Sequence, residues 1–221
     1  HSPREYEEKF ERFGIPIGEE HVFTCTVAAG MYLGQQYPEG GRAYVIGKPA
    51  LAGAVREAGF TILGDARETA DIVVVGSTFD LVYEHLKYGV LHLRAGARFI
   101  GTNPDMLIPT EEGLIPGAGT TIAALEAATG KKPVILGKPE AFFFSEAVQK
   151  MGSRPSATVI IGDRLETDIF GAQRAGLHAV LVTTGVDDEE AAVRMGIRPD
   201  AVFHSLDEIV DAWEGQLSGS V

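Results

Sequence analysis

The chain has 221 residues, 45% of them hydrophobic and 23% charged, which is typical of an ordinary globular protein. Its formal net charge of −12 argues against nucleic-acid binding, because proteins that bind the phosphate backbone usually carry a basic face. The single cysteine, Cys25, excludes an internal disulfide and a cysteine-based zinc site, and it fits a reducing compartment. No apolar stretch approaches the roughly 20 residues that span a bilayer, and no signal peptide is visible. We therefore expect a cytoplasmic protein without membrane contact.

Strand-like and helix-like segments alternate along nearly the whole chain, which favours βαβ units and parallel sheets. The expected strands are 21–25, 42–47, 71–76, 97–101, 133–137, 158–162, 178–184 and 201–204. The expected helices are 3–13, 27–36, 49–60, 81–94, 120–129, 141–151, 166–175, 188–195 and 206–213. Between them, residues 102–119 are expected to form a long Pro/Gly-rich loop, and the final SGSV is expected to fray.

The segment TVIIGDRLETD at 158–168 is the most informative part of the sequence. A buried strand that ends in Gly162-Asp163 places a carboxylate at the sheet edge where open α/β sheets bind ligands. Asp168 follows on the same strand-to-helix loop, and two carboxylates there are costly unless a positive charge lies between them. The pattern indicates a Mg²⁺ site. The alternative is structural: Asp163 ends a strand and Asp168 lies in the first turn of a helix.

Other motifs are less specific. Lys138, in the segment Gly137-Lys138-Pro139, follows a strand and could hold a phosphate or neutralise carboxylates, or could simply be solvated. Residues 47–49 repeat this pattern, and neither copy is a Walker P-loop. PGAG at 116–119 is a poor dinucleotide fingerprint and is more typical of a turn that leads into a helix. Cys25 is interpreted as a buried, inert thiol, and the acidic run 187–190 as a helix cap on the surface.

With GKPE at 137–140 and GDRLETDI at 162–169 placed, the chain resembles phosphatases of the haloacid dehalogenase (HAD) superfamily. The most similar branch is the NagD-like, p-nitrophenylphosphatase-type group with a large α/β cap. The resemblance extends over essentially the whole chain. It includes SPREYEEKFERFGIP, AYVIGKPAL, ARFIGTNPD, IPGAGTTIAALEAATGKKP and AGLHAVLVTTGV.

The resemblance implies a Rossmann-like parallel-sheet core with an inserted α/β cap. Residues 1–25 and 131–221 would form the core and residues 26–130 the cap. Lys138 would orient the nucleophile and the phosphoryl oxygens. Asp163 would be a Mg²⁺ ligand, and Asp168 the second carboxylate, acting directly or through water. The TNPD turn would place Asn103 and Asp105 near the cap–core cleft as substrate-binding residues.

The family's nucleophile is the first aspartate of an N-terminal DxDG-type motif, and no DxD sequence occurs in the 221 residues. We therefore expect a truncated HAD core, inactive or nearly so alone, in which strands such as TVIIG present unpaired edges. The leading hypothesis is a Mg²⁺-dependent hydrolase of small phosphate monoesters. Its substrate, a small phosphorylated metabolite, would be selected by cap loops such as 77–84 and 106–118.

Two alternatives remain open. The chain could be a non-catalytic, truncated homologue that binds a phosphorylated metabolite or a protein partner. A nucleotide-binding Rossmann module is the third interpretation, and the glycine spacing supports it poorly. A homodimer through the cap is expected from the family resemblance alone.

Overall fold

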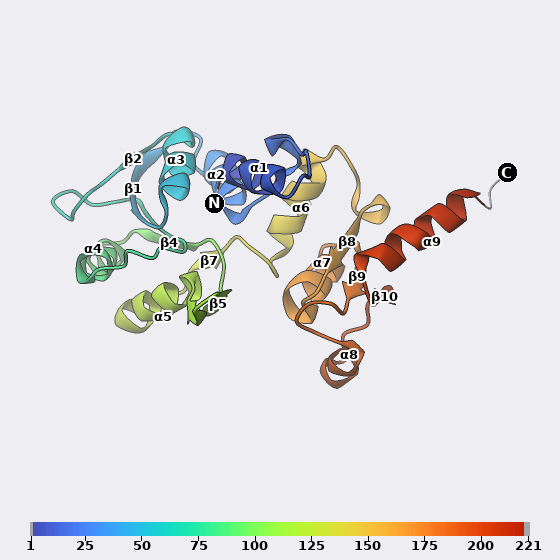
Figure 1. Cartoon of the computed structure of the whole chain (residues 1–221). Coiled ribbons are helices and arrows are strands. Elements are labelled where there is room, and N and C mark those ends of the chain that lie inside the picture. Colours follow the sequence, from blue (N-terminus) through green and yellow to red (C-terminus); the bar gives the residue numbers. More distant parts are fainter. Residues whose placement is uncertain (1, 219–221) are drawn as a thin grey trace. The chain divides into compact units, whose positions relative to one another are not determined.

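The computed structural model describes residues 2–218, with the side chains of residues 2–215. The chain divides into two compact units, His1–Gly137 and Lys138–Val221, which we call unit 1 and unit 2. Figure 1 shows unit 1 in blue through yellow-green and unit 2 in yellow through red. Of the SGSV segment that was expected to fray, Ser218 is the last residue of a helix that begins at Leu206, and residues 219–221 lie outside the described part.

Unit 1 contains a five-stranded parallel sheet in the order β2-β1-β3-β4-β7. In this order the strands are Phe60–Ile62, Gly41–Ile46, Ile72–Val75, Arg98–Gly101 and Val134–Ile135. The β3 segment is buried along its whole length, as expected for a central parallel strand covered on both faces. The second strand along the chain, β2, lies on one side of β1, and the third, β3, lies on the other side. The strand order therefore reverses at β1.

The helices of unit 1 are α1 (Pro3–Arg12), α2 (Cys25–Gln36), α3 (Pro49–Glu57), α4 (Tyr83–Arg94) and α5 (Ala118–Thr129). One face of the sheet packs against α4 and α5, and the core there includes Tyr44, Val73, Leu93 and Leu125. The helix ends follow local rules: the Thr24 side chain caps α2 by accepting the N–H of Val27 at 3.3 Å.

The predicted loop 102–119 contains an antiparallel hairpin, so that part of the prediction is wrong. Its strands are β5 (Leu107–Thr110) and β6 (Gly113–Pro116). The prediction of a strand at 21–25 is also wrong. That segment contains the end of a 3₁₀ turn, Glu19–His21, and the N-cap of α2. The short strand β2 was not predicted.

Unit 2 contains a three-stranded parallel sheet in the order β10-β9-β8. Its strands are β8 (Val159–Gly162), β9 (His178–Val182) and β10 (Ala201–Phe203). Its helices are α6 (Ala141–Lys150), α7 (Phe170–Arg174), α8 (Glu189–Met195) and α9 (Leu206–Ser218), with a 3₁₀ turn at Pro155–Ala157. Phe144, Leu165, Ile169 and Leu181 are fully buried in its core.

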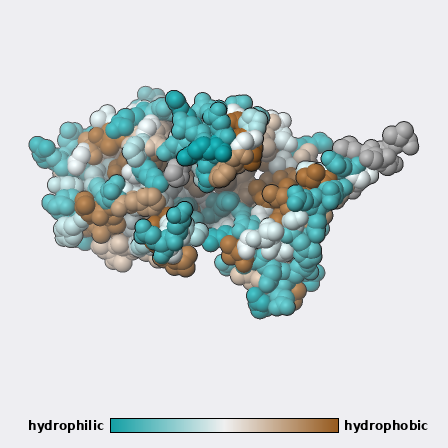
Figure 2. All heavy atoms as spheres, viewed as in Figure 1, coloured by the Kyte–Doolittle hydropathy of each residue, from teal (hydrophilic) through white to brown (hydrophobic). Residues whose placement is uncertain are grey.

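Strand β8 lies at the edge of this sheet, and within the described residues it pairs only with β9. Two of its apolar side chains are partly exposed, Val159 at 40% and Ile161 at 36%. This confirms the expectation that the TVIIG strand presents an unpaired edge. Exposed apolar side chains also occur on α9, where brown areas interrupt the hydrophilic surface in Figure 2.

The division at Gly137 differs from the expected domain boundaries, because residues 1–25 group with unit 1. Compactness alone does not define a family's core and cap, so the assignment of 1–25 and 131–221 to the core stays a prediction. No helix within residues 2–218 is long and apolar enough to cross a membrane.

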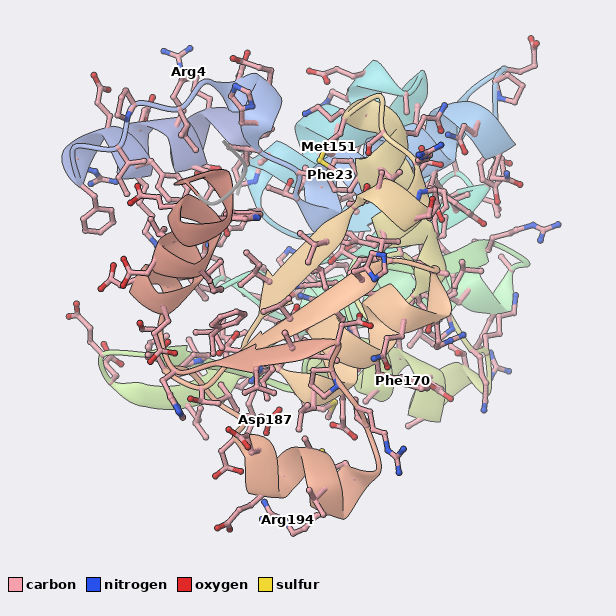
Figure 3. All side chains as sticks on the ribbon, turned by 90° about the vertical axis from the view of Figure 1, so that its right-hand side faces the viewer. Arg4, Phe23, Met151, Phe170, Asp187 and Arg194 are labelled. Carbon is pink, nitrogen blue, oxygen red and sulfur yellow. The ribbon has the colours of Figure 1, made fainter. Side chains whose placement is uncertain are left out.

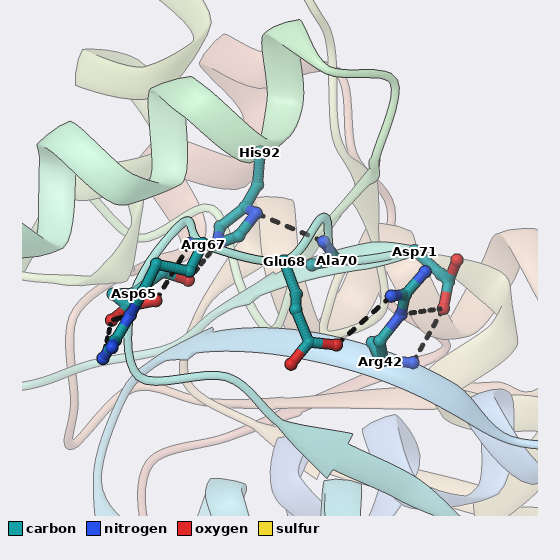
Figure 4. A network of polar contacts seen from close by, with 7 residues as sticks. All are labelled: Arg42, Asp65, Arg67, Glu68, Ala70, Asp71 and His92. Atoms are coloured by element: carbon teal, nitrogen blue, oxygen red, sulfur yellow. Dashed lines mark hydrogen bonds and ion pairs between the residues drawn. The ribbon is translucent and has the colours of Figure 1, made fainter.

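A polar network closes the loop between β2 and β3 (Figure 4). The buried His92 ring accepts the Ala70 N–H at Nδ1 (3.2 Å), so Nε2 carries the proton and donates to the Asp65 carbonyl (3.0 Å). Burial lowers the pKa of His92, which keeps the ring neutral. Nearby, the Asp71 carboxylate accepts the Arg42 N–H at 2.7 Å. The network therefore holds the loop by both neutral and charged hydrogen bonds.

Candidate active site

The candidate site begins where β8 ends, at Gly162 and Asp163. The chain then forms a π-helical turn, Leu165–Ile169, that leads into α7. Gly162 is required by packing, because a Cβ at this position would clash with the Asp168 side chain. This close approach brings Asp168 back against the end of the strand that carries Asp163.

Lys138 and Asp168 form the central contact of the site. Lys138 Nζ donates to Asp168 Oδ1 at 2.6 Å, and the backbone N–H of Arg164 donates to Asp168 Oδ2 at 3.2 Å. The Asp168 side chain is only 7% exposed, whereas that of Lys138 is 41% exposed. A buried carboxylate needs such partners, because an unpaired charge loses its hydration without compensation. Lys138 thus neutralises Asp168 while its ammonium stays accessible.

Asp163 is held by the segment that follows β9. Its Oδ2 accepts the Val186 N–H at 3.1 Å, and its backbone carbonyl accepts the Asp187 N–H at 3.0 Å. Gly185 allows this approach, because a Cβ there would collide with the Asp163 side chain. The two loops at the carboxyl ends of β8 and β9 therefore fix the Asp163 carboxylate together.

These residues fit a Mg²⁺ ion through the chemistry of Asp163. Within residues 2–218 no group of three His, Cys, Asp or Glu side chains could hold a metal ion. Mg²⁺ in phosphoryl-transfer sites, however, commonly takes one or two carboxylates together with water and substrate phosphate. In the described part of the chain, Asp163 Oδ1 has no hydrogen-bond partner, so it can serve as such a ligand. Asp168 uses both oxygens in the contacts above, and its role toward a metal stays a prediction.

The other two predicted site residues lie in unit 1. Asn103 lines a cavity of about 380 Å³ at the carboxyl ends of β1, β3 and β4, and its buried Oδ1 has no hydrogen-bond partner among the described residues. Asp105 contributes a backbone contact: its carbonyl accepts the Gly119 N–H at 2.9 Å. The PGAG segment is thus a turn that packs on the TNPD turn and starts α5, as the sequence indicated. Cys25, interpreted as buried, is partly exposed and lines the same cavity as Asn103.

Sequence reasoning missed Lys48 and Asp187. Lys48 lines the cavity beside Asn103, with its Nζ 4.2 Å from the centre of the Phe79 ring. Its repeat of the GKP pattern was the available signal. Asp187 accepts the Leu165 N–H at 2.8 Å and so contacts the loop that carries Asp163, although it was interpreted as a surface residue. Nothing in the sequence around Asp187 indicates that it contacts Leu165, which lies 22 positions earlier in the chain.

A parallel α/β sheet with a lysine-neutralised carboxylate loop at its carboxyl edge is the arrangement that the HAD resemblance predicts. A family model described as haloacid dehalogenase-like hydrolase matches residues 1–61, and a HAD-hydrolase-like model matches residues 135–209. The 5'-nucleotidase YutF of Bacillus subtilis is 39% identical over 207 residues, which are 94% of this chain and 79% of that protein. The chain belongs to the HAD superfamily, in its NagD-like, p-nitrophenylphosphatase-type branch.

Solved structures agree with this assignment. The p-nitrophenyl phosphatase from Archaeoglobus fulgidus matches with a TM-score of 0.88 at 33% identity, covering 96% of this chain and 82% of that one. The glycerol phosphate phosphatase Rv1692 from Mycobacterium tuberculosis, solved in complex with magnesium, matches with a TM-score of 0.89 at 35% identity. That match covers 94% of this chain and 63% of the other. The predicted α/β fold of the HAD type is therefore confirmed.

Proposed function

We propose that the chain provides the phosphate and Mg²⁺ site of a phosphatase that acts on small phosphate monoesters. The observation that carries this proposal is the pairing of Lys138 with the buried Asp168 beside the open carboxylate of Asp163. The relatives support it, because they are phosphatases. The magnesium complex of one of them supports the choice of metal.

In this proposal the three residues of the loop cluster have distinct tasks. Asp163 holds Mg²⁺, which would neutralise charge on the transferring phosphoryl group. Lys138 supplies a positive charge for the phosphoryl oxygens, and Asp168 fixes the position of its ammonium. Asp168 also contributes negative charge to the metal site, directly or through water.

The 221 residues contain no DxD sequence, and the family places its nucleophilic aspartate in such a motif. We infer that these residues alone turn over substrate slowly or not at all. Attack on phosphorus needs the nucleophilic aspartate of such a motif, whereas binding of phosphate and metal does not.

The cavity in unit 1 is a separate candidate site, which we propose for a small anionic ligand. It lies outside the carboxyl ends of β1 and β3, the place where the strand order reverses and where open α/β sheets bind ligands. Among the described residues, its lining includes Lys48 and Asn103 but no acidic side chain. A second cavity of about 720 Å³ is lined by Glu111 and Glu112 and by no basic residue of the described part, so it suits an anionic substrate less well.

The test is hydrolysis of p-nitrophenyl phosphate with and without Mg²⁺. The 221-residue chain and a form extended by a DxDG-bearing segment are compared, each with Asp163→Asn as control. Turnover in the extended form alone, lost on Asp163→Asn, supports the proposal. Turnover by the 221 residues refutes the inference of inactivity. Absence of turnover and of Mg²⁺ binding in both forms refutes the phosphatase proposal and leaves a non-catalytic homologue. The cap-mediated homodimer stays a separate prediction.

A further inference from the structure

Two adjacent carboxylates at the start of α8 have different partners. Asp188 Oδ1 accepts the Ala191 N–H at 2.7 Å and caps α8 in the usual way. Asp187 Oδ2 instead accepts the Leu165 N–H at 2.8 Å, in the loop after β8. Figure 3 shows Asp187 between the three-stranded sheet and α8, the helix that carries Arg194. Only Asp188 therefore has the capping role that the sequence suggested.

The Leu165 N–H opens the π-helical turn, where a backbone donor has no partner within the turn. Asp187 satisfies this donor, and its own backbone N–H donates to the Asp163 carbonyl at 3.0 Å. Together with the bond from Val186 to Asp163 Oδ2, three hydrogen bonds join the two loops. Two of these bonds end on Asp163 itself, and the third ends on Leu165, two residues further along the loop.

We propose that Asp187 is a positioning residue for the metal site, acting through the loop backbone rather than as a ligand. This inference rests on the proposed function, because it assumes that Asp163 binds Mg²⁺. Partners that orient a metal ligand typically change metal affinity about 10–100-fold when they are removed. Asp187 acts one step further from the ion, so we expect the lower end of this range.

The test measures Mn²⁺ binding, as a paramagnetic probe for the Mg²⁺ site, by electron paramagnetic resonance on the 221-residue chain. Asp187→Ala should weaken Mn²⁺ binding about tenfold. Asp187→Asn, which keeps an oxygen acceptor for Leu165, should stay within about threefold of the unmodified chain. Asp188→Ala is the matched control: it removes a neighbouring carboxylate and a helix cap, and it should leave Mn²⁺ affinity unchanged. Amide hydrogen exchange at Leu165 should rise in Asp187→Ala only.

Two results would overturn the inference. Unchanged Mn²⁺ affinity in Asp187→Ala would show that the hydrogen bond has no effect on the site. Equal weakening in Asp187→Asn and Asp187→Ala would assign the effect to charge rather than to positioning. Asp163→Asn separates these results from failure of the proposed function: if the unmodified chain and Asp163→Asn bind Mn²⁺ equally, the metal site itself is wrong.

Discussion

The buried His92 predicts a specific pH dependence of stability. Its side chain is about 1% exposed, so protonation of the ring would bury a charge. Its Nδ1 accepts the Ala70 N–H, so a proton on Nδ1 would point at that N–H and break the hydrogen bond. The folded-state pKa is lowered by burial, so the unfolded chain binds this proton first as the pH falls. The stabilising contribution is therefore complete above the unfolded pKa of about 6.5 and decreases below it.

The size of the effect follows from linkage. Between the unfolded and the folded pKa of His92, the free energy of unfolding falls by at most about 1.4 kcal/mol for each pH unit. His92→Gln is the reference, because a glutamine amide can accept from Ala70 and donate to Asp65 without titrating. We expect the free energy of unfolding of the unmodified chain to fall relative to His92→Gln as the pH drops below about 6.5.

The assay is native-state amide hydrogen exchange of β3, which reports on unit 1 alone. The free energy of opening is compared between the two proteins from about pH 7.5 to about pH 5.5, with exchange rates corrected for pH. Parallel curves for the unmodified chain and His92→Gln would refute the reasoning, since every other titrating group is common to both.

Three further predictions concern packing, the site and the cavity. Phe144→Ala should lower the free energy of unfolding of unit 2 by about 3–5 kcal/mol, as followed by the fluorescence of Trp213, the single tryptophan. Gly162→Ala should displace Asp168 and weaken Mn²⁺ binding at least about tenfold, and an affinity equal to that of the unmodified chain would contradict the packing argument. Lys48→Glu should reduce the protection that inorganic phosphate gives unit 1 in amide hydrogen exchange of β3, and unchanged protection would exclude the cavity as an anion site.

Much of the fold follows from local signals. Proline at the first turn marks the starts of α1 and α3, and Gly130 in the left-handed conformation ends α5. The strand that delivers Asp163 was predicted because a short apolar run ends in Gly-Asp before a helix. The contact between Lys138 and Asp168 agrees with the expectation that a positive charge compensates these carboxylates.

The misplaced segments have physical reasons. At 21–25 the β-type composition favoured a strand, but Thr24 instead satisfies the first N–H groups of α2. In the β5–β6 hairpin, Pro109 and Pro116 argued against strands, because proline has no backbone N–H to donate to a neighbouring strand. In a two-stranded ribbon, however, each strand has a partner on one side only, so proline is tolerated there. Asp187 could not be found from its neighbours, because its partner is distant in sequence.

The division of the chain at Gly137 separates the two candidate sites described above. Lys138, Asp163, Asp168 and Asp187 all belong to unit 2, whereas the cavity with Lys48 lies wholly in unit 1. A recombination point at this boundary would transfer the whole charged loop cluster in one piece and exchange the cavity in the other. Chimeras with relatives would therefore inherit the cavity and the charged loop cluster from different parents.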